Sequence, residues 1–129
     1  MNGFEKSIST EPARDVLDVK AMMPSESRLQ ILVDIFAALA DPTRARIIFA
    51  LSQQSLCVQD LAVLAEVSES AISHQLRLLK DRRLVTPRRK GTRIYYSLTH
   101  QHLVALYREA EYAADHLINQ IPDHPYPLP

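Results

Sequence analysis

The chain has 129 residues, of which 47% are hydrophobic, and it carries one cysteine and no formal net charge at pH 7. This length predicts one small domain, the lone cysteine excludes an internal disulfide, and no apolar run is long enough to cross a bilayer. We therefore expect a cytoplasmic protein with no membrane partner. The sequence lacks glycine-rich phosphate loops and zinc-protease motifs, so we expect neither an enzyme nor a small organic substrate.

Residues 1–24 are polar and mixed in charge, which predicts a flexible N-terminal arm with at most a helical turn across 13–22. A DNA-binding and dimerisation domain is expected over residues 25–119. The last segment, 120–129, is too rich in proline to be helical. The sequence thus predicts one folded domain between two tails.

The domain should open with a helix from Ser25 that carries more apolar residues than a monomer core needs. Asp41 is the predicted N-cap of the next helix, and Pro42 takes its first position, where a missing N–H costs nothing. Arg44 and Arg46 follow this cap. We expect both to be solvated surface cations.

A short helix over 59–65, a tight link at 66–67 and a second helix beginning at the N-cap Ser68 predict a helix-turn-helix. Ala71, Ile72, Leu76 and Leu79 form an inward stripe on the second helix. Its other face carries short hydrogen-bonding groups and then cations, as a helix in the major groove needs. The candidate DNA contacts are Ser68, Ser70, Ser73, His74, Gln75 and Arg77.

Residues 84–98 predict a β-hairpin: a strand, a Lys90-Gly91 turn, and a second strand rich in β-branched and aromatic residues. Between Arg77 and Arg93 there are eight cations and only one acid, Asp81, a local charge of about +7. Such a concentration is typical of a surface that binds a polyanion. We expect contacts to phosphate or the minor groove from Arg88, Arg89, Lys90 and Arg93.

A final helix is expected from a Thr99 cap to about Asn119, and four of the five histidines follow residue 99. His102 and His116 are fourteen residues apart, so they share a helix face but lie about 21 Å from one another. Two such helices packed antiparallel about a dimer axis would bring His102 of one chain to His116 of the other. This geometry predicts a homodimer with two equivalent metal sites.

Four motifs then carry a family resemblance, namely LADPTR (39–44), LCVQDLA (56–62), SESAISHQL (68–76) and GTRIYY (91–96). Over roughly residues 26–118 the chain resembles the ArsR/SmtB family of metal-sensing repressors. The resemblance implies a mainly α fold with a small β-hairpin wing, a winged helix-turn-helix that dimerises through its first and last helices. It also implies binding to double-stranded operator DNA.

The nickel- and cobalt-sensing branch of this family is the more similar one. It implies a site made of His102, Asp115, His116 and His124, with His100 as an extra or alternative ligand. The zinc-sensing pattern is broken, because one of its positions falls on Ala113. Nitrogen and oxygen ligands without thiolate suit nickel, cobalt or zinc. A zinc sensor that uses His100, His102, Asp115 and His116 stays an alternative.

A second family site uses the cysteine matching Cys57 together with cysteines from the arm, which this chain lacks. We therefore expect Cys57 to be a small buried apolar residue. Two further interpretations stay open. One is a winged-helix regulator without a metal effector, and the other is a metal-binding interaction module with an incidental basic hairpin.

Overall fold

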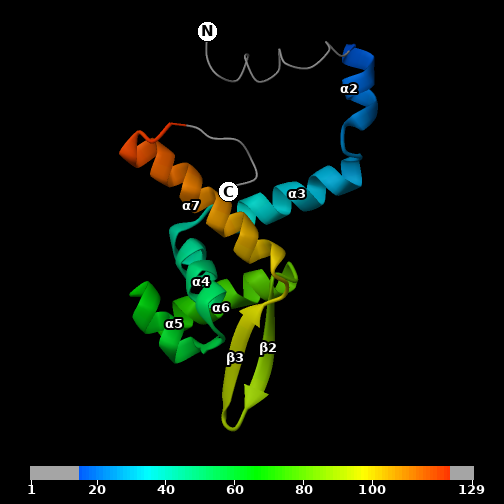
Figure 1. Cartoon of the computed structure of the whole chain (residues 1–129). Helices are drawn as coiled ribbons and strands as arrows, with labels where there is room; N and C mark the ends of the chain where they lie inside the picture. The colour runs from blue at the N-terminus through cyan, green and yellow to red at the C-terminus, as the bar shows by residue number, and fades with distance from the viewer. Residues whose placement is uncertain (1–14, 123–129) are drawn as a thin grey trace. The chain divides into compact units, whose positions relative to one another are not determined.

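The computed structural model describes residues 15–122, and the chain divides into two units, Met1–Val33 and Asp34–Pro129. The first unit contains α2 (Val16–Met22) and the beginning of α3 (Glu26–Leu39), which continues into the second unit (Figure 1). Asp15 caps α2, because its Oδ1 accepts a hydrogen bond from the Leu17 amide at 3.3 Å. The helical turn expected across 13–22 is therefore present in its described part.

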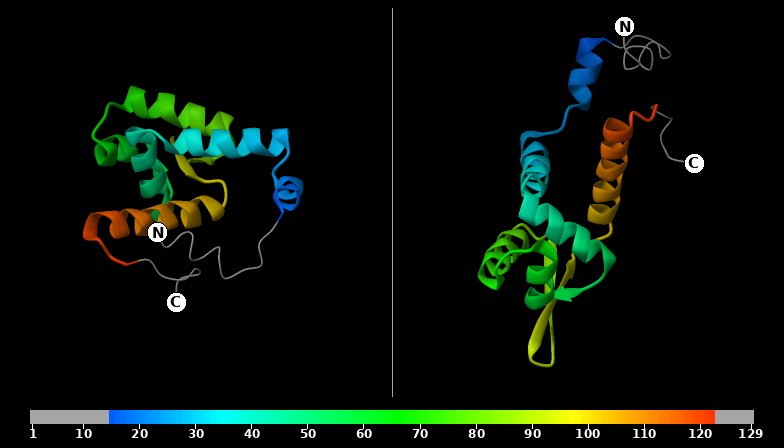
Figure 2. Two further views of the ribbon diagram at one scale, coloured as in Figure 1. Left: turned by 90° about the horizontal axis from the view of Figure 1, so that it is seen from above. Right: turned by 90° about the vertical axis from the view of Figure 1, so that its left-hand side faces the viewer.

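The second unit holds a winged helix-turn-helix, which confirms the predicted fold class. After α3, the elements are α4 (Pro42–Gln53), β1 (Leu56–Cys57), α5 (Val58–Ala65), α6 (Glu69–Asp81), β2 (Val85–Lys90), β3 (Arg93–Leu98) and α7 (His102–Asn119). The three strands form an antiparallel sheet in the order β1-β3-β2. The right-hand view of Figure 2 shows the β2–β3 hairpin extending beyond α4, α5 and α6.

Two of the three predicted helix caps are confirmed. Asp41 Oδ2 accepts from the Arg44 amide at 3.0 Å, with Pro42 at the first position of α4. Ser68 Oγ accepts from the Ala71 amide at 3.1 Å. The link between α5 and α6 turns sharply, since Glu66 adopts the left-handed conformation with φ 57°.

Two expected boundaries are wrong. Thr99 does not cap α7, which begins three residues later behind Gln101, a residue that makes no side-chain capping bond. Thr99 instead closes the hairpin, because its amide donates to the Leu84 carbonyl at 3.0 Å. The hairpin turn lies one residue later than expected, since β2 includes Lys90 and Gly91 takes the left-handed φ of 66°.

The core connects α4, α5 and α6 to the base of the hairpin and to the start of α7. The predicted α6 stripe is confirmed for Ile72, Leu76 and Leu79, each at most 1% exposed, while Ala71 is half-buried. Each such aliphatic side chain contributes about 1.5–3 kcal/mol by leaving water. This packing fixes the opposite, polar face of α6 relative to the hairpin. No helix within residues 15–122 has the length and apolarity to cross a bilayer.

Candidate DNA-binding and metal-binding surfaces

The outer face of α6 is polar and accessible. Five predicted contacts are exposed, namely Ser68, Ser70, Ser73, His74 and Arg77. The hydroxyl oxygens of the first two lie 3.2 Å apart at the helix start. Small hydroxyl donors and acceptors at a helix N-terminus, followed by a cation, suit entry into the major groove. Five of the six predicted α6 contacts are therefore exposed.

Gln75 is the exception, because it is half-buried and its Oε1 accepts from Arg44 Nη1 at 2.9 Å. The remaining nitrogens of Arg44 donate to the last turn of α3, Nε to the Ala38 carbonyl at 2.7 Å and Nη2 to the Ala37 carbonyl at 3.3 Å. The expectation that Arg44 is a solvated surface cation is therefore wrong. Arg46 is exposed, as expected.

The hairpin presents Arg88, Arg89 and Lys90 as exposed side chains. Arg88 and Lys90 point to the same sheet face, since alternate residues of a strand do so. That face holds an open hollow of about 680 Å³ lined by Ser55, Arg88, Lys90, Tyr95 and Ser97. Cations and hydroxyl groups around one hollow make a surface suited to a phosphate oxygen.

Arg93, the fourth hairpin cation, is also exposed, but its guanidinium contacts Cys57 of β1. Its Nη1 lies 3.6 Å from Cys57 Sγ, and this hydrogen bond is the main cause that raises the pKa of Arg93. The Cys57 thiol donates to Asp60 Oδ2 at 3.1 Å. Cys57 is fully buried, as predicted. Its sulfur also makes polar contacts with Asp60 and Arg93, so Cys57 is not the purely apolar residue that we expected.

The predicted metal ligands lie at the two ends of α7. His102 is the first residue of the helix and is exposed, while Asp115 and His116 lie in its last turns. The rings of His100 and His102 are adjacent, with centroids 5.6 Å apart. Within residues 15–122 no three histidine, cysteine or acidic side chains are close enough to hold a metal. His124 lies outside the described residues.

His116 is held in an orientation that metal binding favours. Its Nδ1 lies 2.9 Å from the Ile121 carbonyl oxygen, and a carbonyl only accepts, so Nδ1 carries the proton. The lone pair of the ring then lies on Nε2. Metal-bound histidines commonly donate their other ring nitrogen to a backbone carbonyl in this way, so the donor chemistry of this residue fits a transition metal.

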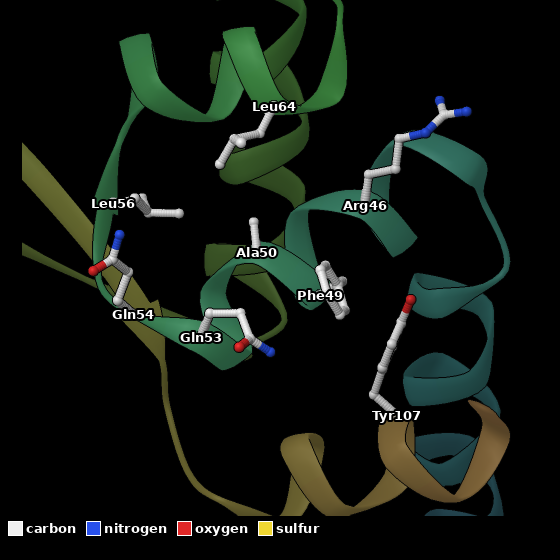
Figure 3. A pocket seen from close by; sticks show the side chains of 8 residues that line it. All are labelled: Arg46, Phe49, Ala50, Gln53, Gln54, Leu56, Leu64 and Tyr107. Carbon is white, nitrogen blue, oxygen red and sulfur yellow. The ribbon is translucent and has the colours of Figure 1, made fainter. Parts of the chain in front are cut away.

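A separate, mainly apolar cavity of about 470 Å³ lies among α4, α5 and α7. Figure 3 shows Phe49 and Tyr107 side by side at one end and Leu56 with Gln54 at the other. The Phe49 and Tyr107 ring centroids are 5.8 Å apart, and burial, then Glu111, raises the pKa of Tyr107. None of the predicted site residues lines this cavity.

Comparisons with known proteins agree with this geometry. Residues 41–86 match the arsR family of bacterial regulatory proteins. The chain is 46% identical over 116 residues to a transcriptional repressor SmtB homolog of Synechocystis sp., covering 88% of this chain and 86% of that protein. It is 32% identical over 99 residues to the HTH-type transcriptional regulator KmtR of Mycobacterium tuberculosis, covering 77% and 76% of the two chains.

Among solved structures, the homodimeric winged helix-turn-helix DNA-binding domain of a possible ArsR-family transcriptional regulator from Mycobacterium bovis has a TM-score of 0.69. Its sequence is 27% identical, and the match covers 79% of this chain and 97% of that domain. The family match includes the helix-turn-helix, and the Synechocystis relative aligns over most of both chains. The chain therefore belongs to the ArsR family of DNA-binding transcriptional regulators and is not an enzyme.

Proposed function

We propose that the chain is a homodimeric, cytoplasmic repressor that leaves its operator when Ni(II) or Co(II) binds between two α7 helices. Zn(II) is the alternative metal. The observation that carries this proposal is the placement of donors on α7, with His102 at its first residue and Asp115 and His116 near its end. The intervening helix is about 21 Å long, so one chain cannot join these donors around one ion.

The dimer in this proposal would use the apolar surface of α7. Leu117 and Ile118 are 82% and 76% exposed, and Tyr112 is 40% exposed. Helix α3 also presents exposed Leu29 and Ile31. Large apolar side chains gathered on one helix are typical of a protein–protein contact. An antiparallel pair of α7 helices would cover Tyr112 and Leu117, which lie within about 100° of the histidines around the helix axis, and would bring His102 to the partner's His116.

The DNA surface in this proposal combines α6 with the hairpin. Base edges would meet Ser70, Ser73 and His74, and phosphates would meet Arg77 and the hairpin cations. All four hairpin cations are exposed, but the guanidinium of Arg93 donates to the Cys57 sulfur. We therefore assign phosphate binding mainly to Arg88, Arg89 and Lys90, and keep Arg93 as a further candidate.

Metal binding can release DNA only if it favours a dimer geometry that fits the operator poorly. A chain of packed helices supplies a mechanical connection: α7 packs on α4, α4 on α5 and α5 on α6. Leu103 of α7 belongs to the same buried core as Ile72 and Leu76 of α6. A shift of α7 would then be transmitted to α6. The coupling has to be reciprocal, so DNA would weaken metal binding by the same factor.

The test begins with selection of a duplex from a random library by the apo protein. Its affinity is then measured by fluorescence anisotropy with and without Ni(II), Co(II) and Zn(II). We expect the effective metal to weaken binding by about 5- to 150-fold, and EDTA to restore it. An affinity unchanged by every metal would favour a regulator without a metal effector, and failure to select any sequence would favour an interaction module.

The visible absorption spectrum of the Co(II)-loaded protein tests which coordination geometry, and so which class of metal, the site favours. A six-coordinate Co(II) site gives weak visible absorption, whereas a tetrahedral one gives intense bands, and histidines with carboxylate and tail ligands favour the former. Loss of tight binding in His100→Ala, with intense Co(II) bands in the wild type, would instead support the zinc alternative. Unchanged metal binding in His100→Ala would support the nickel and cobalt ligand set, which does not require His100.

A further inference from the structure

Arg44 connects α6, the helix that presents the candidate base contacts, to the last turn of α3. Its three guanidinium nitrogens donate to the carbonyls of Ala37 and Ala38 and to Gln75 Oε1, at 3.3, 2.7 and 2.9 Å. Both carbonyls belong to the last turn of α3. The Ala38 carbonyl has no amide four residues later to bind it, because residue 42 is proline. The Ala37 carbonyl also accepts from the Ala40 amide at 3.2 Å. Because Arg44 is half-buried and all three nitrogens donate within the protein, it is poorly placed to bind DNA phosphate.

This contact also determines the orientation of the Gln75 amide. A guanidinium has no acceptor, so the Gln75 atom that faces Arg44 has to be the oxygen. The amide nitrogen, Nε2, is then the group that Gln75 can turn to a ligand. Gln75 lies on α6 between the exposed residues His74 and Arg77, one turn after Ala71.

We infer that Arg44 is a positioning residue that makes Gln75 a hydrogen-bond donor in the major groove, and that Gln75 therefore reads guanine. This inference rests on the DNA binding proposed above. Unconstrained glutamine commonly reads adenine with both amide atoms, its oxygen accepting from N6 and its nitrogen donating to N7. With the oxygen bound to Arg44, the matching purine edge is the one that carries only acceptors, N7 and O6 of guanine.

The experiment compares duplexes selected from a random library by the wild-type protein and by Gln75→Ala. We expect one position in each half-site to lose its preference in the variant, and the wild-type preference there to be guanine. Replacing that base by 7-deazaguanine should weaken wild-type binding about tenfold and leave Gln75→Ala unaffected. A wild-type preference for adenine, thymine or cytosine at that position would overturn the inference.

Two variants separate the roles of the pair. Gln75→Glu keeps an acceptor for Arg44 but has no donor, so it should lose the guanine preference while its thermal melting temperature stays near that of the wild type. Arg44→Lys should also relax discrimination at this position, because one ammonium cannot replace three directed donors. The matched control is Arg46→Ala, which removes an exposed cation of the same helix and should keep the guanine preference.

Failure of the inference is distinguishable from failure of the proposed function. A wild-type protein that selects no sequence would remove the DNA-binding proposal itself. If the wild type and Gln75→Glu both select duplexes and show the same base preferences, DNA binding stays in place and base reading by Gln75 is refuted. A guanine preference that persists in Arg44→Lys at full strength would refute positioning by Arg44.

Discussion

Among single side chains, Tyr107 and His116 show how the position of α7 alters chemistry. His116 gains a fixed tautomer from the Ile121 carbonyl, at the end of the same helix. Tyr107 lies against Phe49 of α4, where burial disfavours its phenolate. The first contact fixes which ring nitrogen of His116 carries the proton, and the second depends on the packing of α7 on α4.

Tyr107 therefore predicts a pH dependence of stability. Burial raises its pKa in the folded protein above the ordinary value of 10.0, so the stabilising contribution is complete below pH 10. It disappears as the pH rises through the raised pKa of the folded state. As the pH rises from 9 to above the ordinary tyrosine value of 10.0, the wild type should lose thermal stability more steeply than Tyr107→Phe. Equal slopes for wild type and Tyr107→Phe would show that burial of the Tyr107 hydroxyl has no energetic consequence.

At the scale of elements, α6 is stabilised by one face and functions through the other. Ile72→Ala removes a side chain that is fully buried, and we expect it to lower the free energy of unfolding by about 2–5 kcal/mol. Urea denaturation followed by circular dichroism measures this loss. Ser73→Ala, the exposed neighbour, should change stability by less than about 0.5 kcal/mol.

The hairpin is the second functional element. In Arg88→Ala combined with Lys90→Ala, binding should weaken on all duplexes alike, and the salt slope should fall by about 0.9 for each phosphate that is no longer neutralised. The control pair Arg46→Ala with Arg108→Ala removes the same charge outside the candidate surface. An equal change of slope in both pairs would mean that net charge, and not the hairpin, governs binding.

The accuracy of the sequence predictions also depends on scale. The caps at Asp41 and Ser68 and the stripe through Ile72 were predictable because they follow local rules of spacing and hydrogen bonding. Strand β1 was missed, since two residues cannot display an alternating pattern. The role of Arg44 was missed as well, because its partner Gln75 is 31 residues away and no local signal connects them.

The metal site was predictable only in part. Histidine spacing on α7 is a local property and agrees with the helix bounds, His102–Asn119. The tautomer of His116 depends on where the chain turns after α7, which spacing does not specify. Ligand sharing between chains depends on how two copies pack, so it stays a prediction about the assembly.

At the scale of the whole molecule, the proposed function depends on a second copy of the chain. The donors near the two ends of α7 would belong to different sites, each completed by the partner, and the exposed Tyr112 and Leu117 would be covered by the same association. His102→Ala and His116→Ala should each abolish tight metal binding while DNA binding by the apo protein stays close to wild type. Neither side chain lies on α6 or the hairpin.

Mixing these two variants tests the shared site most directly. Random exchange of subunits makes about half of the dimers mixed, and each mixed dimer would contain one intact site, formed by His116 of one chain and His102 of the other. Metal titration of the exchanged mixture should therefore recover about a quarter of the wild-type sites. No recovery, in a sample whose exchange is verified by mass-labelled subunits, would contradict a metal site shared between the two α7 helices.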